Sequence, residues 1–214
     1  MTAPDWQGQV DRPTRITLLR HGQTPLSVDR RYSGHGDPAL TELGRSQAAA
    51  AAQRLGARDQ IDVIVSSPLA RARATAQAVA DVVGLPVQVH DGLIETDFGA
   101  WEGLTFREAA ARDPELHRRW LGDLETAPPG GESFAAVGAR LVATKRELLA
   151  QYPGARILAV SHVTPIKTML RDALGVGPEL LFRLHLDLAS LSIAEYYPDG
   201  GAVVKLVNDT GHLS

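Results

Sequence analysis

The sequence predicts an α/β fold: a three-layer sandwich with a mostly parallel central sheet, an antiparallel edge and helices on both faces. Three observations predict this class. Apolar segments rich in β-branched residues alternate along the chain with helical patterns, which is typical of parallel strands joined by helices. These segments run apolar without interruption, so both faces of each strand should be buried. The chain closes with two apolar segments around a turn sequence, which indicates an antiparallel hairpin.

The individual elements follow from the same patterns. Three strands are expected within residues 16–22, 61–71 and 156–163, each of which turns polar within a residue or two of its apolar run. The hairpin is expected from residues 188–197 and 202–208, which flank a Pro-Asp-Gly-Gly turn. Helices are expected where cap residues precede helical patterns. They run from the N-cap Thr41 to near Gly56, from the N-cap Ser67 with Pro68 at the first position to Gly84, from about Ser133 to Gln151, and from Thr164 to Leu174.

Length and composition indicate one globular domain. The chain has 214 residues, of which 44% are hydrophobic and 22% charged, and these are ordinary values for a folded protein. We expect residues 15–214 to form the domain. Residues 1–14 are polar and contain proline, which predicts a flexible tail or the remnant of a linker to a preceding domain.

Charge and cysteine content exclude several function classes. The formal net charge is −3 and no long run of Lys or Arg occurs, which argues against nucleic acid contact by this domain and against membrane-surface binding. The chain has no cysteine, so disulfides, thiolate metal clusters and a cysteine nucleophile are excluded. No signal-peptide pattern and no apolar run of spanning length is present, so a cytoplasmic location is expected.

Four polar side chains stand where the predicted strands end. Arg20 and His21 follow the first strand, Arg71 lies in the first turn after the second, and His162 ends the third. Because the carboxyl ends of parallel strands form one rim of the sheet, these residues should converge. Two guanidinium groups together need a compensating anion, and a helix start adds positive potential. Gly22 would allow close backbone approach after His21. The pattern therefore predicts a phosphate site.

Several motifs together resemble the histidine phosphatase (phosphoglycerate mutase-like) superfamily. They are LLRHGQT, GHGDPALTELGRSQA, SSPLARARATAQ, LIETDFGAWEG, PGGES and VSHVTPIKTML, in that order, over roughly residues 15–208. The resemblance implies that His21 is the nucleophile that accepts the phosphoryl group. It implies that Arg20, Arg71 and His162 hold the phosphate oxygens and that Glu95 is the proton donor. On composition alone, Asp97 or Glu102 would compete with Glu95 for that role.

The resemblance also places Gln23, Ser27 and Val163 at the substrate. Two of these positions depart from the family pattern. Ser27 stands where many members carry Asn, although its hydroxyl can still donate a hydrogen bond. Val163 and Thr164 replace the glycines of the common SHGG motif. If that glycine serves only through its backbone N–H, Val163 can replace it, whereas a positive φ there would require a different loop.

The expected activity is hydrolysis of a small-molecule phosphate ester through a phosphohistidine, with no metal and no cofactor. The compact DFGAWEG form resembles the phosphatase branch of the superfamily, and within it α-ribazole phosphatases of cobalamin biosynthesis. Relatives of that type occur fused behind ribonuclease H-like domains, so a fusion partner N-terminal to residue 15 is one expectation. Two alternatives remain: a phosphoglycerate mutase-type isomerase, with extra cations from Arg30, Arg31 and Arg73, and a catalytically inactive phospholigand-binding module.

Overall fold

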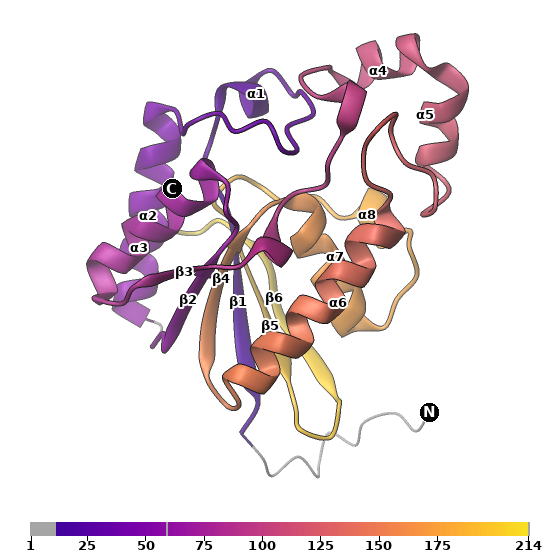
Figure 1. The fold of residues 1–214 in the computed structure, drawn as a ribbon. Coiled ribbons are helices and arrows are strands. Elements are labelled where there is room, and N and C mark those ends of the chain that lie inside the picture. The colour runs from indigo at the N-terminus through magenta and orange to yellow at the C-terminus, as the bar shows by residue number, and fades with distance from the viewer. Residues whose placement is uncertain (1–11, 59, 214) are drawn as a thin grey trace.

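A mixed sheet forms the centre of the molecule. The computed structural model describes residues 12–58 and 60–213, and within them six strands pair in the order β3-β2-β4-β1-β5-β6 (Figure 1). The strands are β1 (Thr14–Arg20), β2 (Val63–Ser66), β3 (Val87–Val89), β4 (Arg156–Ser161), β5 (Leu191–Tyr196) and β6 (Ala202–Asp209). Strands β1 to β4 are parallel, whereas β5 pairs antiparallel with both β1 and β6. The predicted fold class, including its antiparallel edge, is confirmed.

Helices cover both faces of the sheet. Figure 1 shows α2 and α3 against one face and α6 and α7 against the other. The helices are α1 (Pro25–Val28), α2 (Glu42–Arg58), α3 (Ala70–Val83), α4 (Phe106–Arg112), α5 (Pro114–Trp120), α6 (Phe134–Gln151), α7 (Val163–Leu174) and α8 (Leu180–Arg183).

Alternate residues of the central strand β4 supply the two cores. Ile157 and Ala159 pack into the cluster formed with α6 and α7, whereas Leu158 and Val160 pack into the cluster formed with α2 and α3. Successive side chains of a strand point to opposite faces, so a strand between two helical layers must be apolar at every position. This arrangement confirms the expectation that both strand faces are buried.

The predicted helix starts are confirmed at two positions and wrong at a third. The Thr41 hydroxyl accepts a hydrogen bond from the Gly44 N–H at 3.0 Å, and Ser133 caps α6 in the same way. Ser67, however, does not cap α3, which begins at Ala70 with Leu69 in the cap position. The Ser67 side chain instead lies 2.7 Å from Nε2 of His162. Its hydroxyl thus contacts a histidine of the site, and it also accepts a hydrogen bond from the Leu69 N–H at 3.4 Å.

A cap over the carboxyl ends of the strands was not predicted from the sequence. Helices α4 and α5 and the segment that leads into α6 lie there in Figure 1. Their aromatic side chains form a separate core cluster with Tyr32, in which Trp101 is completely buried and donates from Nε1 to Asp113 at 2.7 Å. The cap thereby places aromatic rings above the strand ends.

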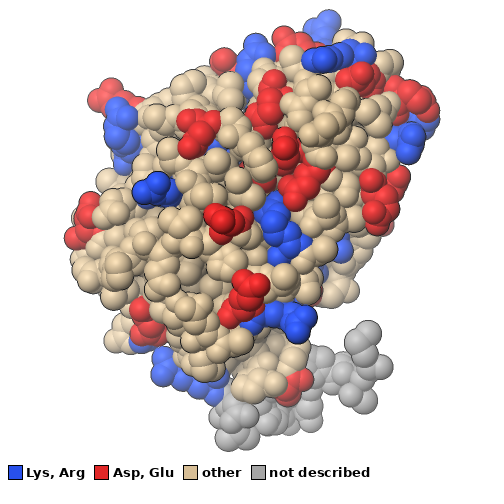
Figure 2. Space-filling model, viewed as in Figure 1, with Lys and Arg blue, Asp and Glu red and all other residues tan. Residues whose placement is uncertain are grey.

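Of the tail predicted at residues 1–14, the structure describes only residues 12–14. Residues 1–11 lie outside the described residues, and the expectation of a tail at 1–14 is not tested. Thr14 already belongs to β1, where it pairs with Tyr196. Within the described ranges, no helix is both long and apolar enough to cross a membrane. Acidic and basic side chains are interspersed on the face shown in Figure 2.

Candidate active site

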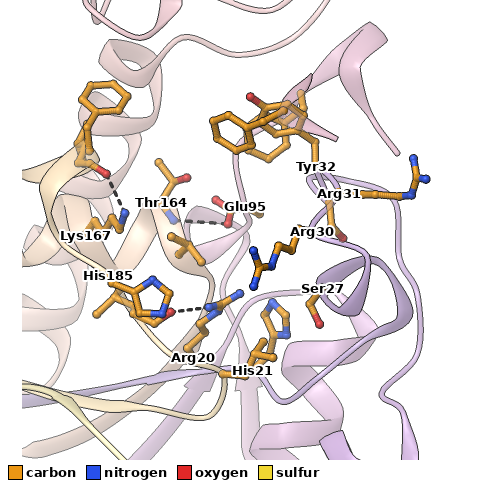
Figure 3. Close-up of a pocket in the computed structure, with 18 of the residues that line it drawn as sticks. Arg20, His21, Ser27, Arg30, Arg31, Tyr32, Glu95, Thr164, Lys167 and His185 are labelled. Carbon is orange, nitrogen blue, oxygen red and sulfur yellow. Dashed lines mark hydrogen bonds between the residues drawn. The ribbon is translucent and has the colours of Figure 1, made fainter. Parts of the chain in front are cut away.

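A cavity of about 720 Å³ opens at the carboxyl ends of β1 and β4. Its polar end contains Arg20, His21, Glu95 and Thr164, and its other walls combine aromatic, aliphatic and further polar side chains. Figure 3 shows Arg20, His21 and Arg30 close to one another at this polar end, with Tyr32 across the cavity. The strand ends therefore deliver polar side chains to one concave space, as predicted for an open α/β sheet.

His21 follows β1 directly and presents one ring edge to this cavity. Its Nδ1 lies 2.7 Å from the carbonyl oxygen of Gly22. Because a carbonyl only accepts hydrogen bonds, Nδ1 carries the proton and Nε2 keeps a free lone pair. Burial, followed by the charges of Arg20 and Arg71, holds the pKa of His21 well below 6.5. The imidazole is thus uncharged at neutral pH and nucleophilic at Nε2.

Glycine at position 22 is required by backbone packing. A Cβ atom at Gly22 would lie 2.3 Å from the carbonyl oxygen of Gly44 in α2. The chain after His21 therefore runs directly against the helix backbone, as the sequence suggested for a close approach. This packing fixes the turn that carries His21.

His162 ends β4 and lies beside His21 beneath the cavity. The two ring centroids are 5.1 Å apart, and His162 has no exposed surface. Burial, followed by the proximity of the second imidazole of His21 and the charges of Arg71 and Arg20, holds the pKa of His162 well below 6.5. Its Nε2 is 2.7 Å from Ser67 Oγ, whereas its Nδ1 is buried without a partner among the described residues.

The two arginines occupy different positions. Arg20 lines the cavity, donates from Nη1 to the Leu186 carbonyl at 2.5 Å, and has a pKa lowered to about 10 by burial, so it stays charged at neutral pH. Arg71 is completely buried and does not line the cavity. Its terminal nitrogens donate to the carbonyls of Gly34 and Gly36 at 2.8 and 2.7 Å. Within the described chain, Nε of each arginine is buried and lacks a partner.

Of the three candidate carboxyl groups in the loop after β3, Glu95 is the one that lines the cavity. It is 5% exposed and accepts hydrogen bonds from the backbone N–H of Thr96 at 2.9 Å and of Thr164 at 3.4 Å. Asp97 instead accepts from the Gly99 N–H, and Glu102 accepts from the N–H groups of residues 34 and 35. These two carboxylates hold loops, and Glu95 alone of the three faces the cavity.

Arg140 in α6 supports this loop from behind. Its Nη1 donates to the carbonyls of Gly92 and Ile94 at 2.8 and 2.9 Å, and its other nitrogens form a two-point ion pair with Glu132. The residue immediately before Glu95 is thereby fixed to a helix. Sequence reasoning did not identify this contact.

The three predicted substrate-binding residues differ in their positions. Ser27 lines the cavity, but its hydroxyl donates to the Thr24 carbonyl at 2.7 Å within the capping box of α1. Val163 also lines the cavity, as the first residue of α7, and does not have a positive φ, so the departure from glycine causes no backbone strain. Gln23 does not line the cavity, since its Oε1 accepts from the Thr41 hydroxyl at 2.8 Å.

Arg30 and Lys167 are among the cations that line the cavity and were not predicted as site residues of a phosphatase. Arg30 has a positive φ of 54°, and Figure 3 shows its guanidinium directed toward Arg20 and His21. Lys167 lines the cavity, and its ammonium donates to the Leu181 carbonyl at 2.7 Å. Burial lowers the pKa of Lys167. The spacing of four between Val163 and Lys167, which puts both on one face of a helix, is the signal that could have located Lys167.

Nitrogen donors gathered around an uncharged imidazole suit a phosphate group. The chain belongs to branch 1 of the histidine phosphatase superfamily, whose family model matches residues 16–210. Among residues 12–58 and 60–213, no three His, Asp or Glu side chains are grouped as a metal site would require.

Curated relatives fall into a long and a short type. The bifunctional protein Rv2228c of Mycobacterium tuberculosis is 58% identical over 212 residues, which are 99% of this chain and 58% of that protein. The chain therefore spans less than two thirds of the length of this relative. Phosphoserine phosphatase 1 of Hydrogenobacter thermophilus is 34% identical over 200 residues, covering 93% of this chain and 94% of the relative.

Two of the solved structures that resemble this chain carry phosphatase names. A mycobacterial glucosyl-3-phosphoglycerate phosphatase in complex with VO3 superimposes with a TM-score of 0.84 and 34% identity, covering 92% of this chain and 100% of the other. A candidate α-ribazole-5′-phosphate phosphatase from Escherichia coli gives a TM-score of 0.82 and 30% identity, covering 92% and 96%. The substrates named for these proteins differ from one another, so the comparisons do not favour one particular phosphate ester.

Proposed function

We propose that the chain hydrolyses a small-molecule phosphate monoester through a phosphohistidine formed on Nε2 of His21. The observation that carries this proposal is the uncharged imidazole of His21, whose Nε2 is free at the polar end of a cavity that Arg20 and Glu95 also line. Nε of Arg20 is a buried donor without a partner among the described residues. Such a donor costs about 1–3 kcal/mol, and a phosphate oxygen would supply the missing acceptor.

The first step is an in-line displacement at phosphorus. The Nε2 lone pair of His21 forms the N–P bond while the bond between phosphorus and the ester oxygen breaks. Glu95, in its protonated form, gives its proton to the departing alkoxide, so the alcohol leaves neutral. Positive charge from Arg20 and Arg71 stabilises the equatorial oxygens in transit.

The second step returns the enzyme to its starting state. The Glu95 carboxylate takes a proton from water, the water oxygen attacks phosphorus, and the N–P bond breaks to release inorganic phosphate and neutral His21. One carboxyl group thus serves as acid and then as base. The two backbone N–H groups that bind the Glu95 oxygens hold the carboxyl in one orientation through both steps.

Arg30 is proposed to close the phosphate site from the side of α1. Its exposed guanidinium points to the polar end of the cavity, and no side-chain partner is present for it among the described residues. The variant Arg30→Ala should therefore raise KM for a phosphate ester more than it lowers kcat. Steady-state kinetics would detect this, and an unchanged KM would contradict the assignment.

Of the finer substrate assignments, α-ribazole phosphate remains the proposed ester, supported by the sequence motifs and by the Escherichia coli structure. The mutase alternative is less well supported. Arg31 lines the cavity, but its guanidinium forms an ion pair with Glu108, and Arg73 does not line the cavity. The inactive-module alternative is opposed by the presence of both His21 and Glu95.

Two wider expectations remain proposals. The chain matches 58% of a bifunctional relative, which is consistent with a fusion, and a fusion partner preceding residue 15 stays a proposal from the sequence. A cytoplasmic location and a small-molecule phosphate ester as the partner also stay predictions from the sequence.

A phosphate-release screen tests the proposed function. The panel contains α-ribazole phosphate, phosphoserine, glucosyl-3-phosphoglycerate, 3-phosphoglycerate and p-nitrophenyl phosphate, each with and without a chelator. We expect hydrolysis that the chelator leaves unchanged, that His21→Ala abolishes, and that is highest for α-ribazole phosphate. Isomerisation of 3-phosphoglycerate without phosphate release would favour the mutase, whereas a flat profile would remove α-ribazole phosphate as the specific substrate.

A further inference from the structure

Three exposed apolar side chains from separate elements meet at the cavity. Phe106 begins α4, Leu121 follows α5 and Phe182 lies in α8, with exposed fractions of 54%, 40% and 42%. All three line the cavity that contains His21. Single exposed apolar residues are ordinary, but a contiguous group at the mouth of a site marks a surface for an apolar ligand.

The rings form a recess with three sides. Trp120 lies at the back, with its ring centroid 6.3 Å from that of Phe106 and 6.5 Å from that of Phe182. Among the described residues, no direct ring contact joins Phe106 to Phe182, so these two rings flank Trp120 without touching each other. We call Phe106, Trp120 and Phe182 the aromatic bay.

Buried rings support the aromatic bay from behind. Tyr32 stacks on Phe106 with centroids 4.7 Å apart, and Phe134 contacts Trp120 at 4.8 Å and Phe182 at 5.7 Å. Lys167 holds α8 by its hydrogen bond to the Leu181 carbonyl, next to Phe182. The exposed rings are thus held in place by packing, and a ligand would meet a preformed surface with little ordering cost.

We infer that the aromatic bay binds a planar apolar ring carried by the leaving alcohol of the substrate. This inference rests on the proposed phosphatase function. With phosphorus at His21, the ester oxygen and its substituent must extend into the remainder of the same cavity, whose lining includes the aromatic bay. Flat rings gain more than equal apolar area from offset and edge-to-face contacts with other rings.

Binding of phosphonates that cannot be hydrolysed tests the inference independently of catalysis. Benzylphosphonate, cyclohexylmethylphosphonate and methylphosphonate present a planar ring, a non-planar ring of similar size, and no ring. Calorimetric titration of the wild-type chain should show the order benzyl, cyclohexylmethyl, methyl, with benzyl about 10- to 100-fold tighter than methyl. Equal binding of benzyl and cyclohexylmethyl would show recognition of apolar bulk and overturn the inference, as would equal binding of all three or binding of none.

Variants localise the effect. Phe106→Ala and Phe182→Ala should each remove most of the benzyl preference while leaving methylphosphonate binding unchanged. Phe182→Leu keeps apolar area but not a flat face, so it should make the affinities for benzylphosphonate and cyclohexylmethylphosphonate similar. Val142→Ala, at an exposed position of α6 that does not line the cavity, is the matched control.

The readouts separate the two proposals. Circular dichroism checks the fold of each variant, and the wild-type ranking decides the inference even if an alanine variant does not fold. A benzyl preference that persists in Phe106→Ala and Phe182→Ala would overturn the aromatic bay as the binding site. Failure of the proposed function would instead appear as absence of phosphate release, with the phosphonate ranking intact.

Discussion

Replacement of Glu95 by glutamine should slow hydrolysis by an amount that depends on the leaving group. An alkoxide leaving from a sugar phosphate has a high pKa and needs the Glu95 proton, so its phosphoryl transfer should slow by about 10²–10⁴, the range for general acid–base catalysis. Nitrophenolate leaves without protonation. Its transfer to His21 should be much less impaired, and slow attack by water should then let the phosphoenzyme accumulate.

The structure indicates that Glu95→Gln can be made without unfolding the protein. Both carboxylate oxygens accept backbone N–H groups, at 2.9 Å from Thr96 and 3.4 Å from Thr164. Glutamine has one acceptor oxygen, which should keep the shorter bond, so the longer bond from Thr164 is lost. Loss of this hydrogen bond should lower the free energy of unfolding by about 1 kcal/mol, at the low end of the range for a buried group that loses its partner.

Rapid mixing provides the assay. The variant is mixed with p-nitrophenyl phosphate and, separately, with an alkyl phosphate, and phosphoenzyme formation is followed. A burst of nitrophenol with the first substrate and a slow transfer with the second are expected. Equal slowing of phosphoenzyme formation with both substrates would refute Glu95 as the acid and direct attention to Asp97 or Glu102.

Two further predictions concern stability. Gly22→Ala should lower the free energy of unfolding in urea by about 1–3 kcal/mol, because the added Cβ would lie 2.3 Å from a backbone oxygen. The control is Gly138→Ala in α6, which has open space around it and should not destabilise the fold. Equal effects of the two would contradict this packing. The pKa values of His21 and His162 in the folded protein lie below 6.5, so the unfolded chain binds more protons than the folded chain below about pH 6.5. The free energy of unfolding should therefore be highest above about pH 6.5. It should fall toward pH 5 by up to about 1.4 kcal/mol per pH unit for each histidine. Urea unfolding at pH 7.5, 6.0 and 5.0 should show this slope and a smaller one in His162→Gln; a constant free energy of unfolding would contradict it.

The polar end of the cavity was largely predictable from sequence because its residues are fixed by strand ends. Arg20 ends β1, His21 and His162 directly follow β1 and β4, and parallel strands bring their carboxyl ends to one edge. The same reasoning failed for Arg71 in detail. It predicted convergence near His21 but not that the terminal nitrogens of Arg71 bind backbone carbonyls, because those carbonyls belong to a loop without a local pattern.

The aromatic walls could not be predicted, because they depend on tertiary contacts between distant short helices. Phe106 and Phe182 are far apart in sequence and lie in helices of seven and four residues, too short for a clear periodic pattern. The start of α3 was misplaced for a related reason. Serine is a common N-cap residue, but the position of the Ser67 hydroxyl is determined by its contact with His162 in the folded protein.

The phosphoenzyme itself tests the central claim most directly. Glu95→Gln is mixed with p-nitrophenyl phosphate, quenched in alkali, in which phosphohistidine survives, digested, and mapped by mass spectrometry. We expect one added phosphoryl group on the peptide that contains His21, and none in His21→Ala carrying the same second substitution. A phosphoryl group on the peptide that contains His162, or turnover with no phosphorylated peptide in any variant, would contradict nucleophilic catalysis by His21.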